Sequence, residues 1–271
     1  MTNKKEIPVI AIMRPEIHIR DSVELARSMG FEPLAVPMVV LNNMKDGRFD
    51  SFFTRVMKGE TDYVIFDSAS GIDFTLRKVP HSIRPQFIEA LNRLSVVANS
   101  PGTKQALEET GVKVEGVPSH YSSEGLIDYL RDNVEGAVVD IARGYACSSM
   151  LIEGLRDFGA TVFETIVYNL IDPDGDEQKE LIESAMKGNI DVFAFTNCVI
   201  VNNFFDHAKR LGYDKDIPKV LNNSIVASMG EGTAHALRLH RVKSGVIPDN
   251  FTFEELLRAS MQAYTDAKGH L

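Results

Sequence analysis

The chain has 271 residues, and its 38 acidic against 29 basic residues give a formal net charge of −9 at pH 7. This excess of negative charge argues against nucleic acid or an anionic membrane surface as the main partner. The length suits two α/β domains of ordinary size, with enough apolar residues for two cores.

The opening residues and the cysteines predict the compartment. The stretch MTNKKEIPVIAIMRPE holds only a short apolar run, which predicts a strand rather than a signal peptide. No apolar run approaches the roughly 20 residues of a membrane-spanning helix. Cys147 and Cys198 lie far apart and lack the spacing of metal ligands, so we expect two reduced cysteines in a cytoplasmic protein.

Short β-rich runs alternate with amphipathic segments along the whole chain. The first half predicts strands at VIAIM, EPLAVPMVVL, YVIFDS, SVVANS and KVEGVP, with helices at 19–30, 86–94, 103–111 and 123–131. The second half predicts strands at GAVVDIA, TVFETIVYNL, DVFAFT, NSIVASMG and SGVIP, with helices at 148–159, 179–186, 199–211, 233–239 and 253–264. Such alternation predicts parallel sheets flanked by helices.

The two halves of the chain repeat each other at a nearly constant offset. DYVIF from Asp62 resembles DVFAF from Asp191, an offset of 129 residues, and GTKQAL from Gly102 resembles GTAHAL from Gly232, an offset of 130. Because chance matches would scatter, we expect two similar α/β domains. The repeat is compatible with tandem halves and with one domain inserted into the other.

The order and spacing of these motifs resemble the uroporphyrinogen-III synthases. The matching stretches are VIAIMRPEIHIRDSVELARSMGFEPLAVP, DYVIFDSASGIDF, SPGTKQAL, RGYACSSMLIEGLRDFGATVFETIVY, DVFAFTNCVIVNNF and GEGTAHAL, between about Val9 and Leu257. The chain also departs from the family pattern. Asp67 stands where the family usually has threonine, so we expect its carboxylate to point away from an anionic ligand or to mark a divergent member.

The resemblance implies an α/β fold with two similar parallel-sheet domains, flavodoxin-like or Rossmann-like, joined by a two-stranded linker with a cleft between them. It favours the inserted arrangement, in which residues 1–36 and 172–271 form a discontinuous domain and residues 39–167 form the other. The linkers would then lie near 37–38 and 168–171. The active site is expected in the cleft.

The resemblance also implies the activity. A uroporphyrinogen-III synthase is a hydro-lyase that cyclises hydroxymethylbilane, a linear tetrapyrrole polycarboxylate, with inversion of ring D and loss of water. Neither a metal nor an organic cofactor is expected, nor a nucleic acid or membrane partner, and we expect a monomer. The alternative is a two-domain protein that binds a small anion or a tetrapyrrole without chemistry.

Four strand-to-helix turns are predicted to bind the substrate carboxylates. Helix N-termini offer unpaired backbone N–H groups to anions, and open α/β sheets bind ligands at the carboxyl ends of their strands. The residues concerned are Ser68, Ser70, Ser100, Gly102, Thr103, Thr196, Asn197, Cys198, Gly230, Gly232 and Thr233. The structural alternative is that Thr103 and Thr233 are ordinary helix N-caps.

Side chains for the chemistry itself are few. The resemblance implies Tyr168 as proton donor to the leaving hydroxyl, against the alternative of a linker tyrosine whose hydroxyl is solvated. Arg14 and Arg143 follow equivalent strands and could clamp a propionate, although a surface ion pair is the simpler explanation for Arg143. The stretch DPDGDEQKELIE has Glu177 where a calcium loop needs glycine, so it predicts an interdomain turn and no metal site.

Overall fold

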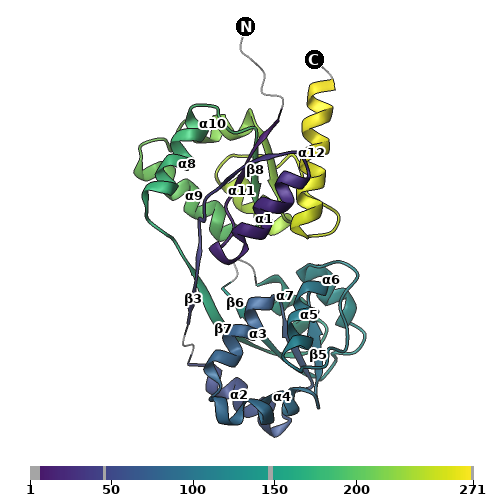
Figure 1. Cartoon of the computed structure of the whole chain (residues 1–271). Helices are drawn as coiled ribbons and strands as arrows, with labels where there is room; N and C mark the ends of the chain where they lie inside the picture. Colours follow the sequence, from purple (N-terminus) through teal and green to yellow (C-terminus); the bar gives the residue numbers. More distant parts are fainter. Residues whose placement is uncertain (1–6, 45–46, 146–148, 270–271) are drawn as a thin grey trace. The chain divides into compact units, whose positions relative to one another are not determined.

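The computed structural model describes residues 7–44, 47–145 and 149–269, which divide into two compact units (Figure 1). Unit 1 contains the residues up to Val40 and those from Ile171 onward, and unit 2 is Leu41–Leu170. The units therefore meet in sequence at Val40–Leu41 and at Leu170–Ile171, and the linkers expected near 37–38 and 168–171 stay a prediction.

Unit 1 is built on a four-stranded sheet of strand order β2-β1-β8-β9 in which every pair is parallel. Its strands are β1 (Val9–Ile12), β2 (Glu32–Ala35), β8 (Val192–Phe195) and β9 (Ile225–Ser228). Helices α1 (Glu16–Ser28) and α12 (Phe253–Gly269) pack on one face, and α8 (Asp176–Met186), α9 (Cys198–Arg210), α10 (Ile217–Asn222) and α11 (Glu231–Leu239) lie on the other. Because both faces are covered, the central strands VIAI and VFAF are apolar at every position.

Unit 2 contains a five-stranded sheet of order β3-β7-β6-β4-β5. Its strands are β3 (Val40–Asn43), β4 (Tyr63–Phe66), β5 (Ser95–Ala98), β6 (Val138–Gly144) and β7 (Thr161–Ile171). One face packs against α2 (Phe49–Lys58), α3 (Ala69–Lys78), α4 (Arg84–Leu91) and α5 (Pro101–Glu109), and the other against α6 (Ser123–Leu130) and α7 (Met150–Asp157). Successive strand residues point to opposite faces of this sheet, and each face has its own apolar core. Val64 and Phe66 face α2–α5, whereas Ile65 faces α6 and α7.

The fold class predicted from the sequence is confirmed, whereas several individual elements are not. Helices α2 and α10 were not predicted, and α3 was predicted only through the turn at its start, at Ser68 and Ser70. KVEGVP and SGVIP form only isolated bridges, at Gly116 and Val246. The run EPLAVPMVVL is not one strand, since its two ends belong to β2 and β3 of different sheets. Helix α2 was overlooked because its aromatic residues favour strands, although Phe49, Phe52 and Val56 are buried at helical spacing.

A buried ion pair crosses unit 2. Asp140 on β6 is fully buried and accepts hydrogen bonds from Arg55 Nε at 2.9 Å and Thr61 Oγ1 at 2.6 Å. The Arg55 guanidinium also lies 4.0 Å from the centroid of the Phe163 ring. Arg55 and Thr61 thus donate hydrogen bonds to the Asp140 carboxylate, whose burial without partners would cost free energy.

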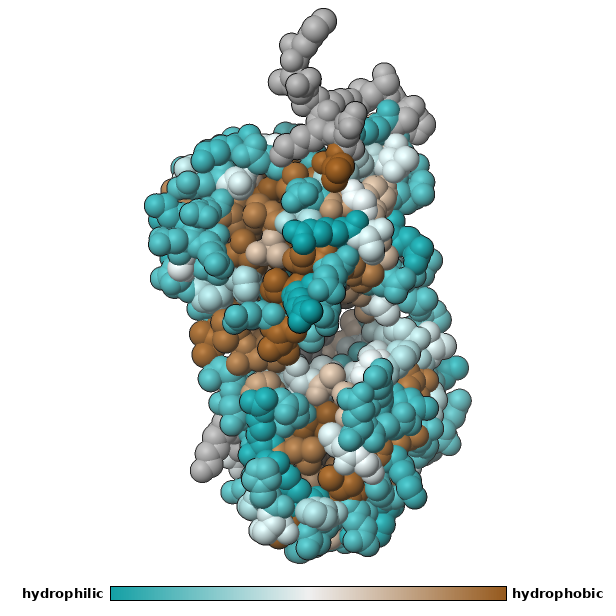
Figure 2. All heavy atoms as spheres, viewed as in Figure 1, coloured by the Kyte–Doolittle hydropathy of each residue, from teal (hydrophilic) through white to brown (hydrophobic). Residues whose placement is uncertain are grey.

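Hydrophilic side chains predominate on the face shown in Figure 2, with apolar patches between them. Large apolar side chains that are well exposed include Ile17 and Leu239, on α1 and α11. None of the helices in the described part of the chain is long and apolar enough to cross a membrane.

Candidate functional site

The turn after β4 positions the first site residues of unit 2. The strand ends at Phe66, and Asp67 and Ser68 lead into α3. Ser68 has an extended backbone with φ −156°, and its Oγ accepts a hydrogen bond from the Gly71 N–H at 3.2 Å. This is N-cap geometry, which explains why α3 begins here despite a glycine and β-branched residues in its sequence.

A β-bulge aims Tyr168 at this turn. In the pairing of β6 with β7, Arg143 lies opposite Ile166 but Gly144 lies opposite Tyr168, so Val167 is an extra residue. The Tyr168 ring occupies the space above Gly144, where an added Cβ would lie 2.3 Å from the ring Cζ. Glycine is therefore required at position 144 for the ring to lie where it does.

The Tyr168 ring and hydroxyl are both held. The ring stacks on Phe74 of α3 with centroids 5.1 Å apart, and the hydroxyl lies 3.0 Å from Ser68 Oγ. Burial, reinforced by the negative charge of Asp67, raises the pKa of Tyr168 well above its usual value. The phenol is therefore neutral at physiological pH and has one proton that it can donate in a hydrogen bond. The residue as a whole is half-buried, and its role as proton donor stays a prediction.

A row of polar side chains crosses the carboxyl edge of the same sheet. Phe66 pairs with Ala98 and with Ala142, so Asp67, Asn99 and Arg143 occupy equivalent positions at the ends of β4, β5 and β6. Their side chains share the face on which Ile65, Val97 and Ile141 pack against α6 and α7. Neither Asn99 nor Glu164, which pairs with Ile141 on β7 and binds Arg143, was predicted, although Asn99 directly follows the apolar run SVVA just as Asp67 follows YVIF.

Arg143 is not at the surface as the sequence predicted. It is only 4% exposed, and its Nε and Nη2 donate to Glu164 Oε1 at 2.8 and 2.6 Å. Burial raises the pKa of Asp67 to about 6, while Arg143 and Ser68 oppose that rise. The expectation that the Asp67 carboxylate points away from an anionic ligand or marks a divergent member stays a prediction.

The turn after β5 contains three more predicted residues. Ser100 is the N-cap of α5, and its Oγ accepts from the Thr103 N–H at 3.2 Å and lies 3.0 Å from Thr103 Oγ1. Thr103 is thus the third residue of the helix and not its cap, because the serine supplies the capping oxygen one turn earlier. Gly102 is the second residue of α5, as Ser70 is of α3. Their backbone N–H groups belong to the first helical turn, where the helix itself provides no acceptor.

In unit 1, Thr196 and Asn197 form the turn between β8 and α9. Asn197 is the N-cap, and its Oδ1 accepts from the Ile200 N–H at 2.9 Å. Cys198 is the first residue of the helix. Its sulfur is in a disulfide, so the expectation of reduced cysteines is wrong for this residue. Cys147 lies outside the described residues.

The turn GEGTAHAL begins α11 earlier than predicted. Gly230 is the N-cap and contributes no side-chain capping bond, so Thr233 is the third helical residue rather than the cap. Glu231, the first residue of α11, brings a carboxylate to this N-terminus, where its charge is favourable. Its Oε2 lies 3.5 Å from Arg238 Nη2.

Arg14 follows β1 and is engaged within unit 1. Its Nη1 donates to Ser22 Oγ at 3.0 Å, and its guanidinium carbon lies 4.5 Å from the centroid of the Phe253 ring. Burial lowers the pKa of Arg14 to about 10, which leaves the group charged at neutral pH. Its predicted contact with a propionate stays a prediction.

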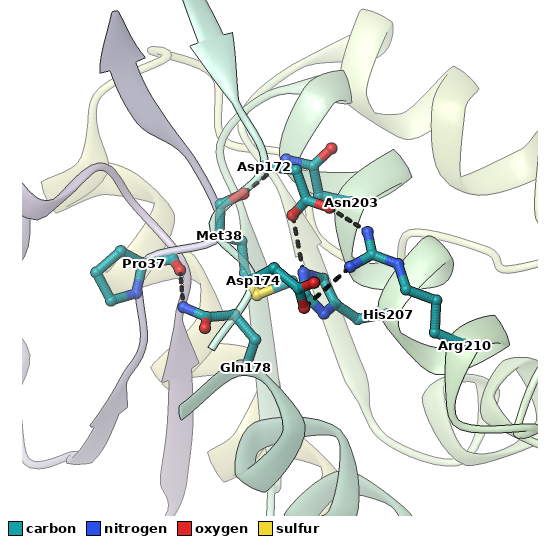
Figure 3. A network of polar contacts seen from close by, with 8 residues as sticks. All are labelled: Pro37, Met38, Asp172, Asp174, Gln178, Asn203, His207 and Arg210. Carbon is teal, nitrogen blue, oxygen red and sulfur yellow. Dashed lines mark hydrogen bonds and ion pairs between the residues drawn. The ribbon is translucent and has the colours of Figure 1, made fainter. Parts of the chain in front are cut away.

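The stretch DPDGDEQ joins a polar network in unit 1 (Figure 3). Asp172 Oδ1 lies 2.8 Å from His207 Nε2, and Arg210 contacts both Asp172 and Asp174. The aspartates are thus used in ion pairs, and no group of three or more metal-ligand side chains occurs among the residues that the structure describes.

The same network holds the segment that leads out of unit 1. Gln178 Nε2 donates to the Pro37 carbonyl and Asn203 Nδ2 donates to the Met38 carbonyl, both at 2.7 Å. Asn203 is buried, so this bond replaces water for both partners. The residues before β3 are fixed to α8 and α9.

Comparison with known proteins agrees with this architecture. A protein of Methanothermobacter thermautotrophicus, provisionally named a uroporphyrinogen-III synthase, is 29% identical over 255 residues, which is 92% of this chain and 96% of that protein. The uroporphyrinogen-III synthase of Chlorobaculum parvum is 25% identical over 202 residues, covering 74% of this chain and 78% of that one.

Solved structures share the fold. A uroporphyrinogen III synthase of Thermus thermophilus matches with a TM-score of 0.64 at 19% identity, over 96% of this chain and 99% of that one. The enzyme of Helicobacter pylori matches with a TM-score of 0.55 at 17% identity, over 95% and 99%. The family model described as uroporphyrinogen-III synthase HemD matches residues 20–258, which is most of the chain. The chain therefore belongs to the uroporphyrinogen-III synthase family.

Proposed function

We propose that this protein converts hydroxymethylbilane to uroporphyrinogen III, closing the macrocycle with inversion of ring D and loss of water, without a metal or organic cofactor. The observation that carries the proposal is the neutral, immobilised Tyr168 hydroxyl, 3.0 Å from Ser68 Oγ at the carboxyl edge of the unit 2 sheet. Membership of the synthase family supports it. The reaction requires only proton transfer, charge stabilisation and positioning of the reacting ends.

Departure of the terminal hydroxyl is the step that Tyr168 would assist. The carbon–oxygen bond breaks, and the oxygen must gain a proton to leave as water. Since the raised pKa of Tyr168 makes its phenolate costly, we assign it the role of hydrogen-bond donor to the departing oxygen, with solvent supplying the net proton. Ser68 orients the phenol, and the Phe74 ring restricts its rotation.

The substrate carboxylates would be held by helix N-termini. In unit 2, α3 and α5 begin at the carboxyl edge with Ser68 and Ser100 as caps. In unit 1, α9 and α11 begin with Asn197 and Gly230. Backbone N–H groups bind anions without added positive charge, which allows a protein of net charge −9 to bind a polyanion. The expectation of an active site between the two units stays a prediction.

Replacing Tyr168 with phenylalanine tests the proposal. We expect Tyr168→Phe to lower kcat for type III formation by roughly 10²–10³-fold, the usual cost of removing one hydrogen-bond donor from a group that develops charge. Tyr129→Phe is the matched control, because Tyr129 is in the same unit, on α6, and 37% exposed. Unchanged kcat in Tyr168→Phe would refute the role of the phenol. Production of type I alone by folded wild-type protein would favour the non-catalytic binding protein instead.

A further inference from the structure

Unpartnered polar atoms are concentrated in unit 2. Among the described residues, the buried side-chain oxygens without a hydrogen-bond partner all belong to this unit. They are Asp67 Oδ1, Thr75 Oγ1, Asn99 Oδ1, Thr165 Oγ1 and Asn169 Oδ1. Buried polar atoms in folded proteins nearly always have partners, so an unpaired acceptor indicates a donor that the chain itself does not supply.

Two of these acceptors are neighbours. Beyond the pairing of Phe66 with Ala98, the Asn99 N–H donates to the Phe66 carbonyl at 3.0 Å, so the ladder extends to Asp67 and Asn99. Their side chains extend from adjacent strands, β4 and β5, on the same face. A carboxylate oxygen and an amide oxygen accept hydrogen bonds and cannot donate them. The pair therefore suits a ligand that carries N–H groups.

The charges around Asp67 also favour a ligand that carries N–H groups. Arg143 directs Nε and Nη2 to Glu164, so this guanidinium is shared by two carboxylates, those of Glu164 and Asp67. The charged and titratable groups that act on Asp67 are Arg143, Glu164 and the Tyr168 hydroxyl. Two negative charges against one positive charge favour a ligand that is electron-poor or becomes cationic.

We propose that Asp67 and Asn99 accept hydrogen bonds from pyrrole N–H groups of the linear tetrapyrrole, and that the Asp67 carboxylate stabilises the cation formed when the hydroxyl leaves. This inference rests on the proposed function for the identity of the ligand. As the carbon–oxygen bond breaks, the oxygen accepts a proton and departs as water. A π electron pair of the pyrrole ring shifts to form the exocyclic carbon–carbon double bond, and the nitrogen lone pair forms a carbon–nitrogen double bond within the ring. The positive charge then resides on the N–H that faces the carboxylate.

Binding of a substrate analogue separates this role from turnover. Methylbilane carries the same pyrroles and carboxylates but has hydrogen in place of the terminal hydroxyl, so its Kd can be measured by titration calorimetry. We expect Asp67→Asn to weaken binding roughly 10- to 100-fold and Asn99→Leu roughly 2- to 10-fold. Asp73→Asn, an exposed carboxylate on α3 paired with Arg77, is the matched control and should bind as the wild type does.

A second probe separates N–H recognition from carboxylate recognition. Mellitate has six carboxylates and no N–H group, so Asp67→Asn should not weaken its binding. In turnover assays, Asp67→Asn should lower kcat on the order of 10²-fold. We expect the wild type to lose activity as the pH falls below the pKa of Asp67, about 6, and the variant not to show this acid limb.

The outcomes distinguish the two proposals. If Asp67→Asn and Asn99→Leu both fold and bind methylbilane as tightly as the wild type, the acceptor site is overturned, whatever the wild type produces. Equal weakening of methylbilane and mellitate would also overturn it. If the wild type makes only type I while the variants bind methylbilane weakly, the proposed activity fails and the acceptor site stands.

Discussion

Replacement of Gly144 by alanine should disable the site through one added carbon. An alanine Cβ would lie 2.3 Å from Tyr168 Cζ, 2.5 Å from Cε2 and 2.7 Å from Oη. Carbon atoms in favourable contact are about 3.5–4.0 Å apart, so the ring has to move by more than about 1 Å. The hydroxyl, now 3.0 Å from Ser68 Oγ, would then lie beyond hydrogen-bond distance.

We expect Gly144→Ala to affect kcat more strongly than the free energy of unfolding. Overpacking costs about 1–3 kcal/mol of unfolding free energy, and the ring sits at a half-buried position near the end of β7, where part of this can be relieved. A misplacement of about 1 Å at a reacting group costs roughly 10²-fold in rate. We therefore expect Gly144→Ala to remain folded but to lose about 10²-fold in kcat.

The assay measures type III formation together with urea denaturation. Gly245→Ala is the matched control, because no atom lies closer than 4.0 Å to a Cβ there and its backbone does not need glycine. Gly144→Ala with wild-type kcat would show that the Tyr168 ring does not occupy this space during turnover. If Gly144→Ala lowers kcat and Tyr168→Phe does not, the Tyr168 hydroxyl is not the group on which kcat depends.

Three further changes test the buried polar groups by urea denaturation. Asp140→Ala leaves the Arg55 guanidinium without its buried partner and should lower the free energy of unfolding by about 3–5 kcal/mol; a loss under about 1 kcal/mol would contradict this. Asn203→Leu leaves the Met38 carbonyl unpaired and should cost about 1–3 kcal/mol, and an unchanged midpoint would show that water replaces the amide. The folded state raises the pKa of Asp67 from 3.8 to about 6 and so binds the extra proton, so wild-type stability relative to Asp67→Asn should fall by about 3 kcal/mol as pH rises from about 3 to about 7. A pH-independent difference would contradict that assignment.

Elements with a strong apolar pattern could be predicted from the sequence. The strands VIAI, VFAF and YVIF were found because they are buried on both faces and lack polar residues. For α3 only the turn at its start could be predicted, because the helix begins at the Ser68 cap and contains a glycine and β-branched residues. The extra residue Val167 in β7 could not be predicted, since a bulge depends on how two strands pair and not on either strand alone.

The strand-to-helix turns of the site could be predicted from the sequence, whereas the buried ion pair between Arg143 and Glu164 could not. Ser68, Ser100 and Asn197 follow apolar runs at equivalent places, which is a local signal. Arg143 and Glu164 come from different strands, and whether the pair is buried depends on the helices above the sheet. The repeat located the turns, but it also placed the helix starts at the threonines instead of at the capping residues.

The isomer ratio of the product decides whether this protein is a synthase. Hydroxymethylbilane is generated in situ, this protein is added in catalytic amount, and the oxidised uroporphyrins are separated by chromatography. We expect a large excess of type III, because the enzyme must invert ring D before closure. Type I alone, at the rate seen without the protein, would refute the proposed activity.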